Sequence, residues 1–204
     1  MKRHLYKPHP WHGLSPGKDC PEIVTAYIEI VTGDSVKYEI DKESGYLKVD
    51  RPQKFSNYVP ALYGFIPQTY CGKEIAAFAK LKSGKDVNKG DGDPLDICVL
   101  TEKDITNGNI ILDAIPIGGL RMLDKGEADD KIIAVLKEDD VFGHYNDIGD
   151  CPEALITRLK HYFLTYKDLP GQQSTIEINS VYGKEEAYTV IRKSLEDYNT
   201  EFKP

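Results

Sequence analysis

The sequence has few cysteines, no long apolar run and no excess of basic residues. No apolar run approaches the length that a membrane-spanning helix needs. Lys and Arg number 26 against 33 Asp and Glu, and the net charge of −7 argues against a nucleic-acid or anionic-membrane partner. The basic start is not followed by an apolar segment, so we expect no signal peptide. The cysteines are widely scattered, which is typical of free thiols in the cytoplasm rather than of disulfides or a zinc site. They are Cys20, Cys71, Cys98 and Cys151.

Length and hydrophobic content predict one globular domain. With 40% hydrophobic residues, the 204-residue chain can bury a core, and we expect a single domain over residues 1–204. Residues 1–21 are predicted to be an N-terminal arm that lies on this domain; a metal site formed by His4, His9 and His12 is the alternative. Residues 68–90 are polar, rich in Lys and without a clear period, so we predict a long inserted loop there.

Alternating apolar and polar residues predict most of the strands. In residues 36–40, Val36, Tyr38 and Ile40 share one face of an extended chain. Further strands are predicted over residues 22–31, 46–50, 97–100, 109–117, 131–136 and 175–181. No strand is predicted in the Gly/Pro/Tyr-rich segment 57–67.

Two helices are predicted after these strands, and they complete a mixed, β-rich α+β fold. Asp150 is suited to cap the first helix, with Pro152 in its first turn. The second helix is predicted from about Lys184 to Tyr198, where apolar residues recur at helical spacing. The apolar stripe of the first helix consists of Leu155, Leu159, Tyr162, Phe163 and Tyr166.

The run DGDPLD at residues 91–96 places three carboxylates within six residues, directly before an apolar strand. Alternate spacing puts Asp91 and Asp93 on one side of an extended backbone, and a turn at Pro94 brings Asp96 back toward them. Carboxylates this close repel each other unless a cation lies between them. The run therefore predicts a site for a hard metal ion such as Mg²⁺. An acidic surface turn is the plain alternative, and an EF-hand loop is disfavoured because its sixth position lacks Gly.

Other polar residues are weak signals singly but agree when taken together. Each can be explained as a solvated strand face, a charged turn in residues 124–131 or a Lys that favours a helix C-terminus. As a set they combine metal-binding carboxylates with Lys, Arg and Tyr side chains that bind anions. This combination suits a phosphate substrate that is bound together with its metal.

The residues resemble the soluble family I inorganic pyrophosphatases from about Glu22 to the second predicted helix. The run DGDPLDI at residues 91–97 matches that family's signature at every constrained position. Outlying matches follow in the family's order: Glu29, Lys37 with Glu39, Arg51 after Asp50, Tyr63 before Gly64, Asp124, Asp129 and Lys131, and the pair Tyr166-Lys167. Two positions depart from the pattern of many members: Val59 replaces a Tyr, and Lys125 replaces an acid found in some.

The resemblance implies a fold and a reaction. The fold is a five-stranded, OB-like barrel flanked by the two C-terminal helices, and the reaction is hydrolysis of pyrophosphate to two orthophosphates. A water activated by several Mg²⁺ ions attacks directly, with Asp93 as the general base. A cytoplasmic homo-oligomer is also implied, with His161 at a subunit contact or simply on a helix face. Substrate ligands implied by the resemblance are Lys37, Arg51, Tyr63, Lys131, Tyr166 and Lys167. Metal ligands implied by it are Asp91, Asp96, Asp124, Asp129, Glu29 and Glu39.

Two rival functions are kept as alternatives. A non-enzymatic protein that binds divalent cations or phosphate needs the carboxylates but no base at Asp93. An OB-like binder of single-stranded nucleic acid needs a basic groove with stacking aromatic side chains, which the net charge of −7 disfavours.

Overall fold

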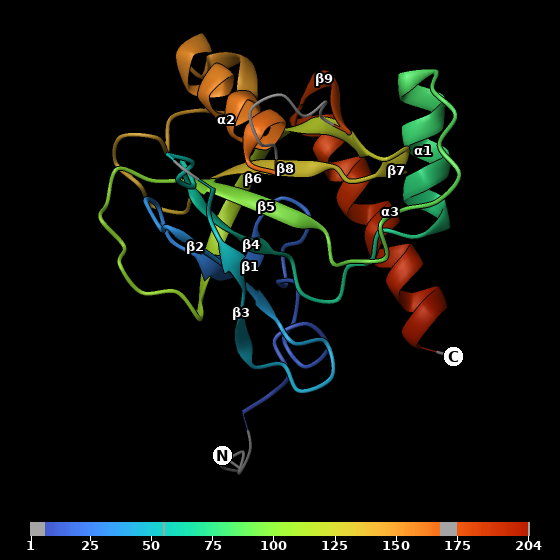
Figure 1. Cartoon of the computed structure of the whole chain (residues 1–204), viewed down its shortest axis with the longest axis horizontal. Helices are drawn as coiled ribbons and strands as arrows, with labels where there is room; N and C mark the ends of the chain where they lie inside the picture. Colours follow the sequence, from blue (N-terminus) through green and yellow to red (C-terminus); the bar gives the residue numbers. More distant parts are fainter. Residues whose placement is uncertain (1–6, 55, 168–174, 204) are drawn as a thin grey trace.

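Five strands close into a barrel in the computed structural model, which describes residues 7–54, 56–167 and 175–203 (Figure 1). The first strand pairs with the second and also with the last strand around the ring, so the sheet closes on itself. This closure confirms the predicted five-stranded barrel. In order around the ring the strands are β1 (Val24–Ile30), β4 (Leu62–Phe65), β5 (Asp96–Leu100), β8 (Lys131–Leu136) and β6 (Ile110–Asp124).

Shorter strands extend the barrel on two sides. β2 (Val36–Ile40) and β3 (Leu47–Pro52) form a separate hairpin. β7 (Glu127–Ala128) and β9 (Ile176–Gly183) pair with the second half of β6. The predicted strands are all present, but β6 continues beyond residue 117, and β4 and the two-residue β7 were not predicted.

The two predicted C-terminal helices are present as α2 (Glu153–Thr165) and α3 (Lys184–Phe202). The prediction of a long loop over residues 68–90 is wrong, because this segment contains α1 (Lys73–Ser83). α1 lies beside α3 on one side of the barrel (Figure 1). It buries Ile75, Ala76 and Ala79 in the core shared with α3. Packing against α3 thus stabilises a helix whose own sequence pattern is weak.

Aspartates from distant parts of the chain cap two of the helices. At the start of α1, the Asp197 carboxylate of α3 accepts hydrogen bonds from the backbone N–H groups of Gly72, Glu74 and Ile75. Asp147 accepts one from the Lys184 N–H at the start of α3 (2.9 Å). These bonds satisfy N–H groups that a helix leaves unpaired at its N-terminus.

The predicted cap of α2 by Asp150 is wrong. Asp150 ends a short 3-10 helix, η1 (Ile148–Asp150), and its carboxylate accepts hydrogen bonds from the N–H groups of Asn146 and Asp147. Pro152 lies at the N-cap of α2, and no side chain within the described ranges caps this helix. The apolar stripe of α2 is confirmed, with Leu159, Tyr162, Phe163 and Tyr166 buried against the barrel and Leu155 partly buried there.

Apart from the first half of β6, where Ile111 and Asp113 are exposed, the barrel strands are largely buried on both faces. Ile97 and Val99 of β5 belong to the cluster beneath α1 and α3, whereas Cys98 and Leu100 belong to the cluster beneath α2. Successive side chains of a strand point to opposite faces, so a strand packed on both faces has few positions for polar side chains. Polar side chains lie instead at the strand ends and in the turns between strands.

The described part of the N-terminal arm, residues 7–21, lies on the domain as predicted. Trp11 is buried and its indole N–H donates to the Thr69 carbonyl oxygen (2.7 Å). The His9 ring bonds with the Lys42 carbonyl and the His12 ring with the Tyr198 hydroxyl. His9 and His12 thus have structural partners, and His4 lies outside the described residues.

Removing the Asp197 carboxylate should destabilise the protein through α1. Asp197→Ala leaves three backbone N–H groups without their acceptor, and a lost N-cap typically costs about 1 to 2 kcal/mol. Urea unfolding followed by circular dichroism measures the loss. The exposed neighbour provides a matched control, because Glu196→Ala should leave the midpoint unchanged. Equal midpoints for Asp197→Ala and the wild type would contradict the capping role.

Candidate active site

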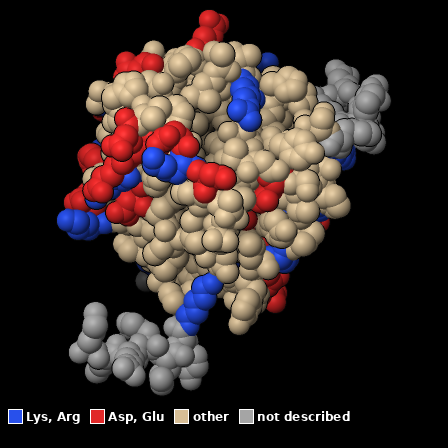
Figure 2. Space-filling view, turned by 90° about the vertical axis from the view of Figure 1, so that its left-hand side faces the viewer, with Lys and Arg blue, Asp and Glu red and all other residues tan. Residues whose placement is uncertain are grey.

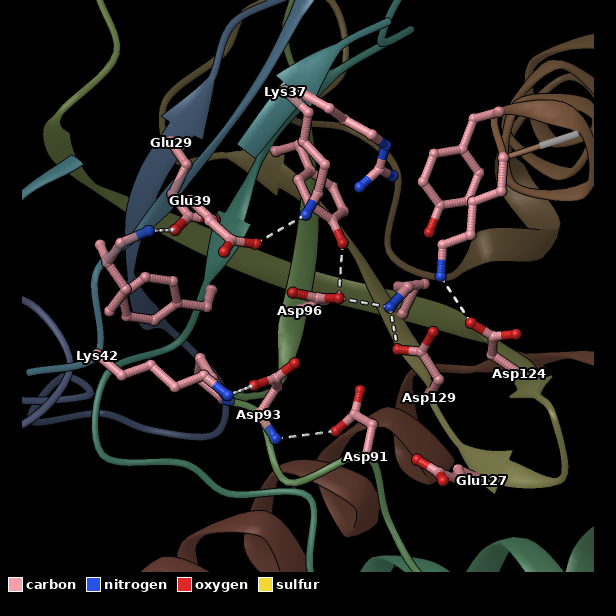
Figure 3. Close-up of a pocket in the computed structure, with 18 of the residues that line it drawn as sticks. Glu29, Lys37, Glu39, Lys42, Asp91, Asp93, Asp96, Asp124, Glu127 and Asp129 are labelled. Carbon is pink, nitrogen blue, oxygen red and sulfur yellow. Dashed lines mark hydrogen bonds and ion pairs between the residues drawn. The ribbon is translucent and has the colours of Figure 1, made fainter. Parts of the chain in front are cut away.

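All thirteen side chains predicted for the site line one cavity of about 430 Å³. It lies at the edge of the barrel, between the hairpin β2–β3, the 91–96 turn and the end of α2 (Figure 3). Acidic and basic side chains both surround it. Its acidic residues are Glu29, Glu39, Asp91, Asp93, Asp96, Asp124, Glu127 and Asp129. Its basic residues are Lys37, Lys42, Arg51, Lys125, Lys131 and Lys167.

A tight turn presents the three carboxylates of residues 91–96. Gly92 has a φ of 76°, a conformation that side chains other than Gly rarely adopt. The Asp93 N–H donates to Asp91 Oδ1 (3.0 Å), which holds the two residues in an Asx turn. Cys71 secures the turn from outside, since its N–H donates to the Asp93 carbonyl oxygen and its own carbonyl oxygen accepts from the Gly92 N–H. The segment before α1 therefore contributes to the site through its backbone.

Close approach of β1 and β4 directs Tyr63 into the cavity. A Cβ atom on Gly64 would lie 1.8 Å from the Tyr27 carbonyl oxygen, so only Gly fits there. The Tyr63 hydroxyl donates to Asp96 Oδ2 (2.6 Å). Burial, with the Asp96 charge nearby, raises the pKa of Tyr63 well above its usual value. Tyr63 therefore stays protonated and available as a donor.

Lys131 links two of the carboxylates. Its ammonium group contacts both Asp96 and Asp129, and its side chain is only 2% exposed. Burial lowers the pKa of Lys131, but the charges of Asp129 and Asp96 outweigh burial and the pKa lies well above its usual value. Burial raises the pKa of Asp129 despite Lys131, and burial together with the Asp129 charge raises that of Asp91. Negative charge is thus concentrated here beyond what one Lys neutralises.

A second group of cations lies across the cavity. Lys37 Nζ donates to Glu39 (3.0 Å) and to Asp50 (2.8 Å), and Arg51 pairs with Asp50. Arg51 Nη2 is buried and has no hydrogen-bond partner among the described residues. An unpaired buried donor is costly, so the free end of this guanidinium suits an anionic ligand.

Lys167 and Tyr166 lie at the end of α2, where Lys167 Nζ pairs with Asp124 (2.6 Å). Burial alone would raise the pKa of Asp124, but hydrogen bonds from Lys167 and Thr175 bring it below its usual value. Asp124 is therefore a charged carboxylate near neutral pH.

Glu29 of β1 is a buried acid beside the β2–β3 hairpin. Its Oε1 accepts from the Ile40 N–H (2.7 Å). Burial raises the pKa of Glu29 to about 8, and the hydrogen bond from Ile40 offsets only part of this effect. Glu29 therefore carries a proton near neutral pH unless a cation stabilises its charged form.

The donor chemistry of the cavity fits Mg²⁺. Asp96 and Asp129 both contact the Lys131 ammonium group, and Asp91 lines the same cavity, so a cation is already stabilised among these carboxylates. Within the described residues, no three carboxylate, imidazole or thiolate groups converge into a metal cage. Mg²⁺ needs no such cage, since it keeps several waters and uses one or two carboxylates together with substrate phosphates.

Three charged residues of the cavity were not among the predicted site residues. Lys42, whose ammonium forms an ion pair with Asp93 (Figure 3), carried no signal, whereas Lys125 and Glu127 belong to the charged turn in residues 124–131. Lys42 follows the predicted strand 36–40 by two residues, but no sequence signal connects it with residue 93. Val59, which replaces a Tyr of the resembled family, is buried in the core beneath α2 and does not line the cavity.

Known proteins resemble this chain over most of its length. The family model described as Inorganic pyrophosphatase matches residues 26–199. The inorganic pyrophosphatase of Chlamydia muridarum is 57% identical over 195 residues, covering 93% of each chain. Soluble inorganic pyrophosphatase 2 of Chlamydomonas reinhardtii is 37% identical and matches 96% of this chain and 91% of its own length.

A solved structure has the same fold. The inorganic pyrophosphatase of Thermus thermophilus superposes with a TM-score of 0.79 at 30% identity, covering 94% of this chain and 99% of that one. The likeness therefore includes the barrel together with the helices that flank it.

Replacing Glu29 should change how the stability of the metal-free protein depends on pH. Glu29 titrates at about 8 when folded but near 4.5 when unfolded. The unfolded chain thus loses this proton first, and the folded state is penalised increasingly as pH rises from 4.5 to 8. Glu29→Gln cannot ionise and keeps the acceptor for Ile40. Its stability gain in EDTA should be larger at about pH 8.5 than at about pH 6, by about 2 kcal/mol.

Urea titrations at the two pH values measure this difference. Glu22→Gln is the control, because Glu22 is exposed and its replacement should give no pH-dependent gain. A gain for Glu29→Gln that is the same at both pH values would contradict a raised pKa for Glu29.

Proposed function

The chain belongs to the inorganic pyrophosphatase family, and we propose that its cavity hydrolyses pyrophosphate by direct attack of water in the presence of Mg²⁺. The activity of the family is hydrolysis of inorganic pyrophosphate to two orthophosphates, and this chain is a hydrolase of that kind. The observation that carries the proposed mechanism is the convergence of carboxylates, lysines, an arginine and two tyrosines on one cavity. Both a metal ion and a compact polyanion find ligands there.

Enzymes of this family use divalent metal ions, and we propose Mg²⁺ for this one. Bound Mg²⁺ would neutralise charge on the phosphoryl oxygens and lower the pKa of water. Glu29 would act on the metals through water molecules, and Glu39 is proposed as a further metal-binding carboxylate. The carboxylates that would hold the metals directly are Asp91, Asp96, Asp124 and Asp129, with Asp96 shared between ions.

Asp93 is proposed as the general base. It lies on the same turn as Asp91 and Asp96, and it faces the cavity with Lys42 beside it (Figure 3). A base at this position takes the proton of the attacking water while its neighbours bind the metals. Among the described residues that line the cavity, none is Ser, Thr, Cys or His. This supports direct attack by water over a phosphoenzyme formed on Ser, Thr, Cys or His.

Six side chains are proposed to bind pyrophosphate. The planar fork of Arg51 can contact two phosphate oxygens, and its buried Nη2 supports this role. Lys37, Lys131 and Lys167 supply positive charge, while Tyr63 and Tyr166 donate phenolic hydrogens. In this structure each of these lysines is paired with a carboxylate. Substrate and metal together satisfy both partners of such a pair, the ammonium by phosphate and the carboxylate by Mg²⁺.

We also propose a cytoplasmic homo-oligomer without a nucleic-acid partner. The four cysteines are free thiols, which supports a reducing compartment. No helix of the described residues is long and apolar enough to cross a membrane. On the face shown in Figure 2, acidic and basic side chains lie close together, and no broad basic surface is seen there. Val49 on β3 and Tyr46 in the turn before β3 have exposed side chains, which offer apolar contacts for a second copy.

Release of orthophosphate from pyrophosphate is the direct test of function. Mg²⁺ should support rapid release, and excess EDTA should abolish it. Ca²⁺ should bind but support little turnover, because its larger and looser coordination shell positions water and phosphate poorly. A phosphate-release assay with each ion measures this. A protein that binds Mg²⁺ and pyrophosphate without releasing phosphate would be a binding protein, not a hydrolase.

Substitutions of two neighbouring carboxylates should separate their roles. Asp93→Asn removes the base but keeps its shape, so turnover should fall about 10²- to 10⁴-fold, and added Mg²⁺ should not restore it. Asp96→Ala removes a metal ligand, so Mg²⁺ affinity should fall and excess Mg²⁺ should restore part of the turnover. Turnover as a function of Mg²⁺ concentration, with calorimetry for binding, measures both effects.

The exposed strand residue Asp113 provides the matched control for both variants. Asp113→Asn should behave as the wild type, since this residue lies outside the cavity. Rescue of Asp93→Asn by Mg²⁺, together with normal Mg²⁺ binding by Asp96→Ala, would show that the two roles have been exchanged.

A further inference from the structure

A group of charged and aromatic residues, buried at its centre and partly exposed at Phe78 and Glu186, lies behind the cavity wall, and we call it the Arg121 cluster. It consists of Phe78, Arg121, Asp130, Tyr182 and Glu186. Arg121 and Asp130 form its ion pair (Nη1 to Oδ2, 3.1 Å), with side chains 1% and 0% exposed. The Tyr182 hydroxyl also donates to Asp130 Oδ2 (3.1 Å). No described member of this cluster lines the cavity.

Elements from across the sequence meet at the Arg121 guanidinium. Its Nη2 donates to Glu186 of α3 (2.8 Å). Its Cζ lies 5.0 Å from the ring centroid of Phe78 in α1 and 5.1 Å from that of Tyr182 in β9. Such cation–π contacts are attractive and strengthen when desolvated. The helix found in place of the expected loop is therefore connected to β6 through this side chain.

Asp130 connects the cluster to the cavity. It lies between Asp129 and Lys131, which both line the cavity. Successive side chains of an extended segment point to opposite sides, so Asp130 faces the cluster when its neighbours face the cavity. Lys131 begins β8, where it pairs with Asp96 on one side and Leu120 on the other. Fixing Asp130 therefore fixes the direction of the two residues beside it.

Stability alone does not explain the cluster. A buried ion pair is often no more stabilising than apolar side chains of similar size, because both charges lose their hydration. The pairing here is also incomplete, since Arg121 Nε, Arg121 Nη1 and Asp130 Oδ1 are buried without a hydrogen-bond partner among the described residues. A buried ion pair that costs stability is expected where it holds neighbouring functional residues in position.

We propose that Arg121 and Asp130 are positioning residues that hold Asp129 and Lys131 toward the cavity, with α1 supporting them through Phe78. This inference rests on the proposed metal-binding role of Asp129. It also gives α1 a role in the site, although no residue of this helix lines the cavity. Substitution of the pair should therefore weaken Mg²⁺ binding without touching any ligand.

Four variants separate position from stability. Asp130→Asn and Arg121→Met should each raise the dissociation constant for Mg²⁺ about 10-fold, as losses of supporting residues around metal ligands do. Both should also lower the unfolding temperature, because Arg121→Met leaves Asp130 buried without its cation and Asp130→Asn leaves Arg121 with Glu186 as its one carboxylate among the described residues. Phe78→Leu should act in the same direction more weakly. In the double variant Arg121→Met/Asp130→Leu, stability should recover while Mg²⁺ affinity stays weak.

Calorimetric Mg²⁺ titration, without substrate, and thermal unfolding measure these two quantities separately. Val190→Ala controls for lost stability, because Val190 is a buried α3 residue outside the Arg121 cluster. It should lower the unfolding temperature and leave Mg²⁺ affinity unchanged. Lys80→Ala on the exposed side of α1 should change neither quantity.

Two results would overturn the inference in distinguishable ways. Mg²⁺ affinity that follows unfolding temperature across all the variants, and so recovers in the double variant, would show that the pair serves stability alone. A wild-type protein that binds no Mg²⁺ would instead remove the proposed function on which the inference rests.

Discussion

Pairing of opposite charges inside a partly buried cavity is the interaction on which this structure depends. Carboxylates brought together by the 91–96 turn and by residues 124–129 would repel one another without cations between them. Lys131 meets this need between Asp96 and Asp129, and Lys167 meets it beside Asp124. Each of these pairs joins a proposed metal ligand to a proposed phosphate ligand. The interaction energy of charges this close depends strongly on the distances between them. A rigid frame is therefore needed to hold them in place.

The closed barrel supplies that frame. β1 pairs with both β4 and β6, and the polar residues stand at strand ends and in the turns beside them. Side chains on regular elements are held more accurately than those on free loops. Gly64 packs against Tyr27, and Cys71 forms backbone hydrogen bonds to the 91–96 turn. These contacts leave Tyr63 and the turn little freedom to move. Burial of the strands on both faces leaves their ends as the place where chemistry can occur.

The sequence predicted features that depend on local pattern and missed those that depend on distant contacts. The alternation in residues 36–40 predicted β2, and the thirteen side chains implied by the family resemblance all line the cavity. β4 escaped prediction because it is only four residues long and contains Gly64. α1 escaped it because its packing and its cap come from α3. Lys42 is paired with Asp93 only after the hairpin folds against the turn, so its spacing in the chain carries no signal.

The cap of α1 by Asp197 has a consequence for the order in which the chain folds. An eleven-residue helix is marginal by itself in water, and this one obtains its N-terminal acceptors from a residue 125 positions after Gly72. α1 therefore gains its stability late, after α3 has docked on the barrel. The two helices then open and close as one cooperative unit, so that local fluctuations of the C-terminal helix extend to the segment that borders the 91–96 turn. A newly synthesised chain completes this part of the site only when its last turns of helix are in place.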